Sequence, residues 1–411
     1  MLPPNSEKGF ALLFATVLTV GISVAITGSV AFLALSSQTI MRTAQNSSQA
    51  LFAAESGLED AAYRVKNSLP LPLSYTIPLL ATPVEVNVAS EGVVRTVSAK
   101  GIEGTATRNL ELVLEVTSTD IQFFYGAHIG DGGLIMDNNS RVEGNVYSNG
   151  SIQGDSGAVI TETVTVGGAN NEVAEVIVEG DAFVDQCDGS DITNTLHVNT
   201  NQGCTFGSLE TLGTPPDSIP LPISAAQIQQ WKDEAEAGGI TSGTVELDGD
   251  ETLTLGPRKI VGNLEMENSA ILTLTGTLWV TGDIIVKNSA QVRMSSSYGA
   301  TSGVIIADGT ITLDNNSVSS GSGTAGSYLM YLTTNSSSSA LNIKNNAILD
   351  IAYASAGTIV IENNTVLKEA TGYQLHLKNN ATIEYELGLT SSSFSSGLGG
   401  GWEVTSWKEI E

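Results

Sequence analysis

The segment "IKNNAIL" at residues 343–349 returns as "IENNTVL" at 361–367 and as "LKNNATI" at 377–383. Related copies occur earlier as "MDNNSRV", "MENSAIL", "VKNSAQV" and "LDNNSVS". From the second copy onward the leading asparagines are separated by 20, 27, 30, 18 and 16 residues: Asn268, Asn288, Asn315, Asn345, Asn363 and Asn379. Short strands that recur about every 20 residues predict the stacked coils of a parallel β-helix, and the longer periods predict loops inserted into a coil.

The asparagines have a structural explanation within such coils. Asparagine tolerates the left-handed backbone conformation that a tight corner requires, and stacked asparagine side chains can hydrogen-bond from coil to coil. We therefore interpret the six residues as a structural ladder. Asn138-Asn139-Ser140 and similar copies match the acceptor sequence for N-glycosylation, which we discount because we expect the ladder to be partly buried.

The composition agrees with a turn-rich body of short strands, since the chain has 43 glycines and only 6% aromatic residues. We expect a mainly β fold whose right-handed parallel β-helix has a first portion at 121–215 and a main portion at 241–390. A helical segment at 216–240 separates the two portions. We expect residues 391–411 to fold back as a cap or strand.

The separating segment contains "ISAAQIQQWKDEAEAGG" at 223–239. Ser224 is a typical N-cap, and the pattern predicts a helix from Ala225 to about Ala237 that ends at two glycines. Ile228 and Trp231 fall on one face of this helix. We expect that face to cover the side or an end of the β-helix, with a partner-binding helix as the alternative.

The N-terminal region contains "FALLFATVLTVGISVAITGSVAFLAL" from Phe10 to Leu35, and no charged residue lies between Lys8 and Arg42. This run of 26 residues exceeds the length of about 20 that spans a bilayer. A cleaved secretory signal needs a shorter apolar core, so we predict a transmembrane helix. A plain single-pass anchor remains an open alternative.

The sequence after the apolar run predicts that the helix continues out of the membrane, over 10–67 in all. Prolines in "SLPLPLSYTIP" at 68–78 then end it. The outer half carries small and apolar residues at helical spacing, which we expect to face a domain or a neighbouring subunit: Ala50, Ala53, Ala54, Gly57, Leu58, Ala61, Ala62 and Val65.

The leader "MLPPNSEKG" at 1–9, the Phe10 that follows and "AAESGLEDA" at 53–61 resemble the N-terminal region of PilX-like minor type IV pilins and pseudopilins. The resemblance implies that a prepilin peptidase cuts between Gly9 and Phe10 and leaves an N-terminal phenylalanine. Major pilins have glutamate at the fifth mature position, where this chain has Phe14. The resemblance therefore implies a minor or tip subunit.

Three runs after the helix alternate apolar and polar residues: "VEVNVAS", "VVRTVSAK" and "ATRNLELVLEV". They predict three antiparallel strands that pack against the outer half of the helix, within a small β segment at 68–120. In the pilin resemblance this segment is the small globular sheet. A β-meander that serves as a spacer fits equally well.

The charge and the cysteines limit the partners. The chain has 17 basic and 44 acidic residues, a net charge of -27, which argues against binding to nucleic acid through basic patches.

In an exported chain Cys187 and Cys204 are expected to form a disulfide, with free thiols as the alternative. His197 alone cannot complete a metal site, so we expect no metal or cofactor. Calcium at "ELDGDETL" (246–253) is left open.

We expect a cell-surface structural or adhesive protein of minor-pilin or pseudopilin type rather than an enzyme. The histidines stand apart at positions 128, 197 and 376, and the sequence lacks the paired-carboxylate signatures of pectinases. The body would lie outside the cytoplasmic membrane, with other pilins and a glycan or surface ligand as partners. The alternatives are a membrane-anchored β-helical lyase or hydrolase and a surface stalk that does not assemble.

Overall fold

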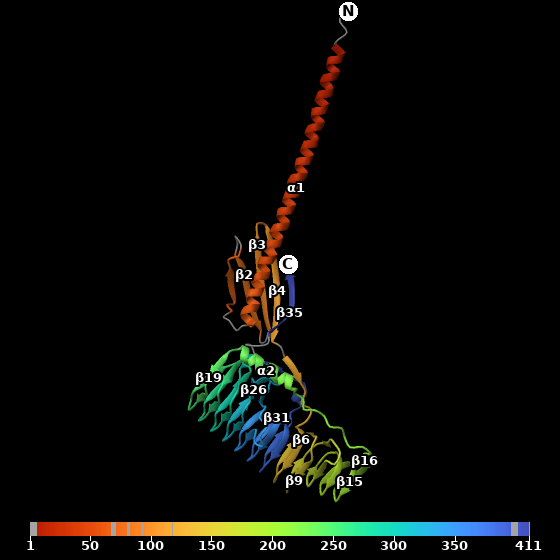
Figure 1. Cartoon of the computed structure of the whole chain (residues 1–411), viewed down its shortest axis with the longest axis vertical. Helices are drawn as coiled ribbons and strands as arrows, with labels where there is room; N and C mark the ends of the chain where they lie inside the picture. Colours follow the sequence, from red (N-terminus) through yellow and green to blue (C-terminus); the bar gives the residue numbers. More distant parts are fainter. Residues whose placement is uncertain are drawn as a thin grey trace, which may run out of the picture.

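A computed structural model describes residues 6–66, 71–79, 83–91, 94–116, 118–395 and 402–410. Figure 1 shows one long helix that projects from a small sheet, with a large β-helix on the other side of that sheet. Residues 1–5 of the expected leader, and residues 396–401 and 411 of the expected C-terminal segment, lie outside the described residues.

Helix α1 runs without interruption from Ser6 to Lys66, because its sequence contains no proline. It is long and apolar enough to cross a membrane by length and composition. Its outer half packs on the small sheet through the predicted stripe, in which these side chains are buried: Ala50, Ala53, Ala54, Leu58, Ala61 and Val65. The small side chains let the helix and the sheet approach closely, and a Cβ atom on Gly57 would already lie 3.0 Å from that of Ala99.

The small sheet is antiparallel, in the order β1-β2-β3-β4-β35. The three predicted strands are confirmed, and the strand bounds are β1 (Ser74–Ile77), β2 (Val84–Glu91), β3 (Val94–Glu103), β4 (Ala106–Val116) and β35 (Trp402–Ile410). Strand β35 pairs with β4, so the C-terminal segment is the edge strand of this sheet. Of the segment 391–411, expected to fold back as a cap or strand, residues 402–410 form a strand.

The β-helix forms a connection between β4 and β35. The chain leaves β4 through β5 (Ser118–Ile121) and returns through η2 (Leu387–Ser391) and β34 (Ser392–Ser395). Strands β5 and β34 pair with each other in antiparallel register, which ties the outgoing and returning chains together. The body is thus an insertion into the small sheet rather than a domain that follows it.

The chain enters the β-helix in its middle. Its first strands, β6 and β7, pair in parallel with the last strands, β32 and β33. Residues 127–211 wind away from this seam to one end of the stack, and residues 240–384 begin at the other end and wind back to it. Figure 1 shows β31, late in the chain, beside the early strands β6 and β9. The two portions predicted from the repeats form one stack. Along this stack, the coils of residues 240–384 come first and those of residues 127–211 follow.

Strands β6–β16 form the first portion, with these bounds: β6 (Ala127–Met136), β7 (Arg141–Glu143), β8 (Val146–Ser148), β9 (Ile152–Gly154), β10 (Val159–Ile160), β11 (Val164–Val166), β12 (Glu172–Ala174), β13 (Ile177–Val178), β14 (Ala182–Asp188), β15 (Asp191–Gln202) and β16 (Thr205–Thr211). The early part of the second portion contains β17 (Ile240–Ser242), β18 (Val245–Leu247), β19 (Thr252–Leu255), β20 (Arg258–Val261), β21 (Leu264–Met266), β22 (Ile271–Leu274), β23 (Leu278–Val280), β24 (Ile284–Val286) and β25 (Gln291–Met294). After η1 (Ser296–Tyr298), the strands are β26 (Gly303–Ala307), β27 (Ile311–Leu313), β28 (Val318–Ser320), β29 (Leu329–Thr333), β30 (Leu341–Ile343), β31 (Ile348–Ile361), β32 (Val366–Leu377) and β33 (Thr382–Glu384).

The interior is filled by columns of aliphatic side chains, one residue from each coil. One column crosses the seam without a change of register, and every member is buried: Leu264, Ile284, Ile311, Leu341, Ile359, Leu375, Leu134 and Ile152. Parallel strands that are covered on both sides read as nearly continuous apolar runs, as in "GVIIA" of β26 and "LMYLT" of β29.

Helix α2 (Ala225–Ala237) covers the outer face of these strands. Ser224 Oγ accepts a hydrogen bond from the Gln227 amide at 3.2 Å, as the N-cap prediction requires. Ile228 and Trp231 are buried in a second hydrophobic core outside the coils, together with residues of β26, β29 and β31. The helix therefore covers a side of the β-helix rather than an end.

Candidate functional site

The exposed half of α1 is the first surface with a functional character. Phe10 is 75% exposed and Phe14 is 62% exposed, and the apolar side chains between Phe10 and Leu35 point outward all round the helix. The Gly9–Phe10 bond lies in the first turns of α1, which begins at Ser6. Such a surface can be buried only by lipid or by other apolar helices.

The corner ladder is the second feature, and the structure brings its six asparagines together. The leading residues have φ between 46° and 59°, and the residue after each also has a positive φ. The ladder bonds are Asn288 Nδ2 to Asn268 Oδ1 at 3.3 Å, Asn315 Nδ2 to Asn288 Oδ1 at 3.1 Å, Asn363 Nδ2 to Asn345 Oδ1 at 2.8 Å, and Asn379 Nδ2 to Asn363 Oδ1 at 3.5 Å. Asn345 interrupts the series because its amide donates to Asp314 Oδ1 at 2.6 Å.

The ladder lies at the surface. Asn268, Asn315 and Asn379 are exposed and the other three leading asparagines are half-buried, whereas the residue that follows each pair is buried. The expectation of partial burial is thus wrong for the exposed members. Burial consequently gives no reason to discount glycosylation at the exposed positions.

Substitutions at Asn288 distinguish two contributions of the ladder to stability: the left-handed backbone conformation and the side-chain hydrogen bonds. We expect Asn288→Ala to lower the free energy of unfolding by about 1–2 kcal/mol, because its φ of 57° is unfavourable for alanine. Asn288→Gly keeps this conformation accessible and loses only exposed side-chain bonds, so it should cost less than about 1 kcal/mol. Urea unfolding of both variants is the measurement. Equal losses would mean that the side-chain bonds, and not the backbone conformation, hold the corner.

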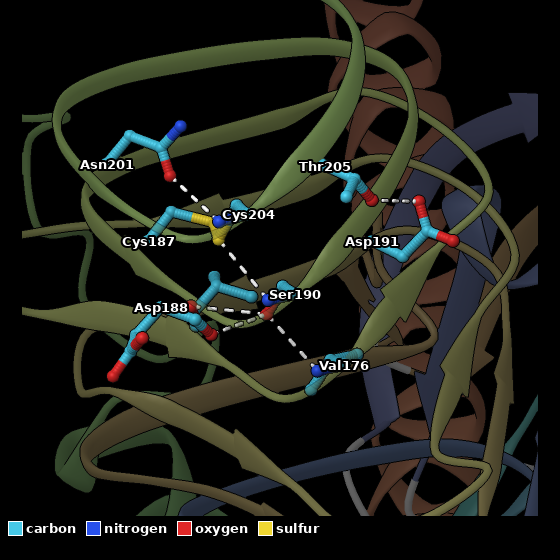
Figure 2. The surroundings of a disulfide bond; sticks show 9 residues. Val176, Cys187, Asp188, Ser190, Asp191, Asn201, Cys204 and Thr205 are labelled. Carbon is cyan, nitrogen blue, oxygen red and sulfur yellow. Dashed lines mark hydrogen bonds between the residues drawn. A yellow bond between two sulfur atoms is a disulfide. The ribbon is translucent and has the colours of Figure 1, made fainter.

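The predicted disulfide between Cys187 and Cys204 is present. It joins Cys187 of β14 to Cys204, which directly precedes β16, the last strand of the first portion, and Figure 2 shows its surroundings. The Cys204 amide donates to Asn201 Oδ1 at 3.0 Å, and the Ser190 amide donates to Cys204 Sγ at 3.3 Å. The next strand, β16, is exposed along its whole length. The disulfide therefore links the preceding coil to a terminal coil whose last strand is exposed to solvent.

Replacing both cysteines by serine should destabilise this end of the β-helix selectively. A cross-link that closes a loop of 17 residues is worth about 3 kcal/mol. We expect hydrogen exchange to become faster over 182–211 in the double variant and to stay unchanged over 264–343. The wild type under reducing conditions is the matched control and should behave like the variant. An equal acceleration in both regions would contradict selective stabilisation of this end by the disulfide.

The histidines lie at three separate places. The His197 ring stacks on Phe183 with centroids 4.1 Å apart, and its Nδ1 atom lies 3.2 Å from Glu210 Oε2. His376 Nε2 lies 2.8 Å from Asp137 Oδ2, which pairs residues on either side of the seam. His128 is buried near the chain entry.

The acidic cluster at 246–253 satisfies part of its own hydrogen-bonding capacity. Asp248 Oδ1 accepts from Asn268 Nδ2 at 2.7 Å, and Glu251 Oε2 accepts from the Asp248 amide at 3.0 Å. Within the described ranges, no group of three or more histidine, cysteine, aspartate or glutamate side chains is arranged to hold a metal ion.

A row of charged residues that no sequence motif predicts lies beside a surface depression of about 420 Å³. Lys368 Nζ lies 3.0 Å from both Asp350 Oδ1 and Glu386 Oε2. The other oxygen of Asp350 accepts from the amides of Gly321 and Leu329, each at 3.0 Å. Asp350 and Glu386 belong to different coils, and no local motif joins them.

The electrostatics of this row favour the ionised form of Glu386. Burial acts to raise the pKa of Glu386, but hydrogen bonds from Lys368 and Tyr328 outweigh it, and the pKa lies below its usual value. Lys368 Nζ also lies 4.9 Å from the centroid of the Tyr328 ring. The row therefore offers alternating charges beside a buried aromatic ring.

Comparison with models of known protein families finds no match, and a search of curated proteins finds none either. Among solved structures, the chain is similar to the competence-associated pilin ComZ from Thermus thermophilus, with 10% identity over 89% of this chain and 97% of that chain. The TM-score is 0.22, which is too low to establish a common fold.

Proposed function

We propose that the protein is a PilX-like minor pilin or pseudopilin whose β-helix contacts a surface or a partner outside the cell. The observation that carries the proposal is the continuity of α1, whose first half is apolar and exposed while its second half packs on an antiparallel sheet. The β-helix is inserted between β4 and β35 of that sheet. The helix–sheet unit can therefore serve for anchoring and assembly while the insertion serves for contact.

Phe14 supports a minor or tip role within this proposal. A carboxylate at this position would offset the N-terminal ammonium group of a neighbouring subunit in a bundle of low dielectric constant. Phe14 leaves such an ammonium without a partner, which disfavours indefinite addition of identical subunits. We propose other pilins as the partners of the apolar half of α1.

The row formed by Asp350, Lys368 and Glu386 supports a contact role over a catalytic one. Hydrolysis of a glycosidic bond by two carboxyl groups needs one of them to be protonated as the general acid. Lys368 bridges the two carboxylates, and its hydrogen bond helps to hold the pKa of Glu386 below its usual value, which disfavours Glu386 as that acid. We propose that this face binds a glycan or protein surface without cleaving it, which leaves the carbohydrate-active enzyme as the less favoured alternative.

Processing is the direct test of the pilin proposal. We expect co-expression with an active prepilin peptidase to remove residues 1–9, which intact mass and N-terminal sequencing would detect as a chain that begins at Phe10. Gly9→Leu should block the cut because the peptidase acts after glycine, whereas Phe14→Tyr should leave it unchanged. An intact Met1 in wild-type chain from such cells would contradict the proposal. Purified filaments probed for the chain then test assembly.

A further inference from the structure

A small cavity lies where the chain enters the β-helix. Its volume is about 210 Å³, and aromatic residues 123–125 line one side of it. Residues from the crossover between the two portions of the β-helix, within 219–222, line another side. Gln122, Glu369 of β32 and His128 of β6 complete the lining. Three segments that are distant in sequence meet here because the seam places β32 beside β6.

Packing alone does not explain Glu369. In the three preceding coils the positions in register with it are Val304, Met330 and Ile351, all buried and apolar. Glu369 is 0% exposed, and its Oε1 atom accepts a hydrogen bond from Thr371 Oγ1. Its Oε2 atom has no hydrogen-bond partner among the described residues. Burial raises the pKa of this carboxyl group well above its usual value, because an ionised carboxylate loses its hydration there, and among the described residues no cation acts on it to lower the pKa.

His128 contributes a second polar atom without a partner. It is in register with Thr371, which lies on the same outer face of β32 as Glu369, and it is only 6% exposed. The ring donates a hydrogen bond to the Ile219 carbonyl oxygen, while Nε2 is without a partner in the described part of the chain. Burial lowers the pKa of His128 to about 4, so the ring is neutral at pH 7. Because the bond to Ile219 then uses Nδ1–H, Nε2 presents a lone pair.

We propose that this cavity binds the ammonium group of a small organic cation. An ammonium group in the cavity offsets the charge of ionised Glu369, so the carboxyl group gives up its proton when the amine binds. The carboxylate oxygen and the bare imidazole nitrogen then both accept hydrogen bonds from the ammonium group. The aromatic lining at 123–125 adds favourable cation–π contacts for such a group. The net charge of -27 raises the local concentration of cations around the molecule.

The volume sets the size of the ligand. A cavity of 210 Å³ corresponds to the liquid volume of about seven water molecules, which fits a compact amine and not an oligosaccharide or a peptide. Phe124 is 53% exposed and forms part of the lining at the surface, where the amine would enter.

Calorimetric titration of the full chain in detergent with propylammonium chloride tests the proposal, with propan-1-ol as an uncharged ligand of similar size. We expect the wild type to bind the alcohol at least about tenfold more weakly than the amine, since only the amine supplies a charge. Glu369→Met and Glu369→Gln should weaken amine binding at least about tenfold. Glu369→Met introduces the residue found at position 330, so the variant should fold, and its melting temperature checks this.

Glu384→Gln is the matched control, because it makes the same substitution on an exposed residue and should leave amine binding unchanged. Three results would overturn the proposal: no binding of the amine by the wild type, equal binding of the alcohol, or undiminished amine binding by folded Glu369→Met. The cavity lies in the β-helix, so none of these results depends on whether the N-terminus is processed.

Discussion

Replacing Gly101 by valine is expected to detach the outer half of α1 from the small sheet. A Cβ atom at Gly101 would lie 2.0 Å from the Ala50 carbonyl oxygen and 3.0 Å from the Ala54 amide nitrogen. These are atoms of the helix backbone and cannot move aside as a flexible side chain could. We expect the free energy of unfolding of the helix–sheet unit to fall by about 3 kcal/mol or more, at the upper end of the cost of overpacking.

Hydrogen exchange over residues 50–66 and over β2–β4 is the measurement for Gly101→Val. Ser98→Ala is the matched control, since Ser98 lies on the same strand with the opposite side-chain direction, away from α1. The control should exchange like the wild type, and the coils at 264–343 should be unaffected in both variants. Wild-type protection over residues 50–66 in Gly101→Val would contradict the close contact between helix and sheet.

Shortening the Leu375 side chain to that of alanine is expected to uncouple the two portions of the β-helix. Leu375 is fully buried in the column that crosses the seam, between Ile359 on one side and Leu134 on the other. Leu375→Ala removes contacts with both portions and should cost about 2–5 kcal/mol, as for other large-to-small core substitutions. Because the seam joins segments that no local connection links, we expect the single unfolding transition to separate into two.

Thermal unfolding monitored by hydrogen exchange can assign one transition to residues 127–211 and the other to residues 240–384. Tyr373→Ala is the matched control on the same strand, because Tyr373 is 45% exposed and its side chain leaves the interior column intact. We expect the control to lose less than about 1 kcal/mol and to keep one transition. A single cooperative transition in Leu375→Ala would show that the seam does not limit cooperativity.

Features that depend on local sequence were predicted from it. The uninterrupted helix follows from an apolar run without proline, and the α2 boundaries follow from Ser224 and the glycines that end the helix. The three strands of the small sheet follow from their alternation of apolar and polar residues. The repeated asparagine pairs indicated stacked coils because each corner needs a residue that tolerates positive φ, and the structure places such residues there.

The order of the coils could not be predicted in this way. Each coil has the same local signal, so nothing in the repeats distinguishes a chain that enters the stack at its end from one that enters at the seam. The pairing of β6 with β32 and of β4 with β35 joins residues more than two hundred positions apart. Hydrogen bonds of this kind depend on which strand edges remain free once the other coils have stacked.

The same limit applies to the sites. A single buried glutamate or histidine has no sequence signature, and Glu369 and His128 become neighbours of one cavity only through the seam. The sequence by itself determined the membrane-length helix, the small strands, the cysteine pair and the repeating coils, because these arise from local periodicity and spacing. Only the tertiary structure decided the insertion into the small sheet, the order of the stack and the amine cavity, because strand pairing and burial depend on contacts between distant segments.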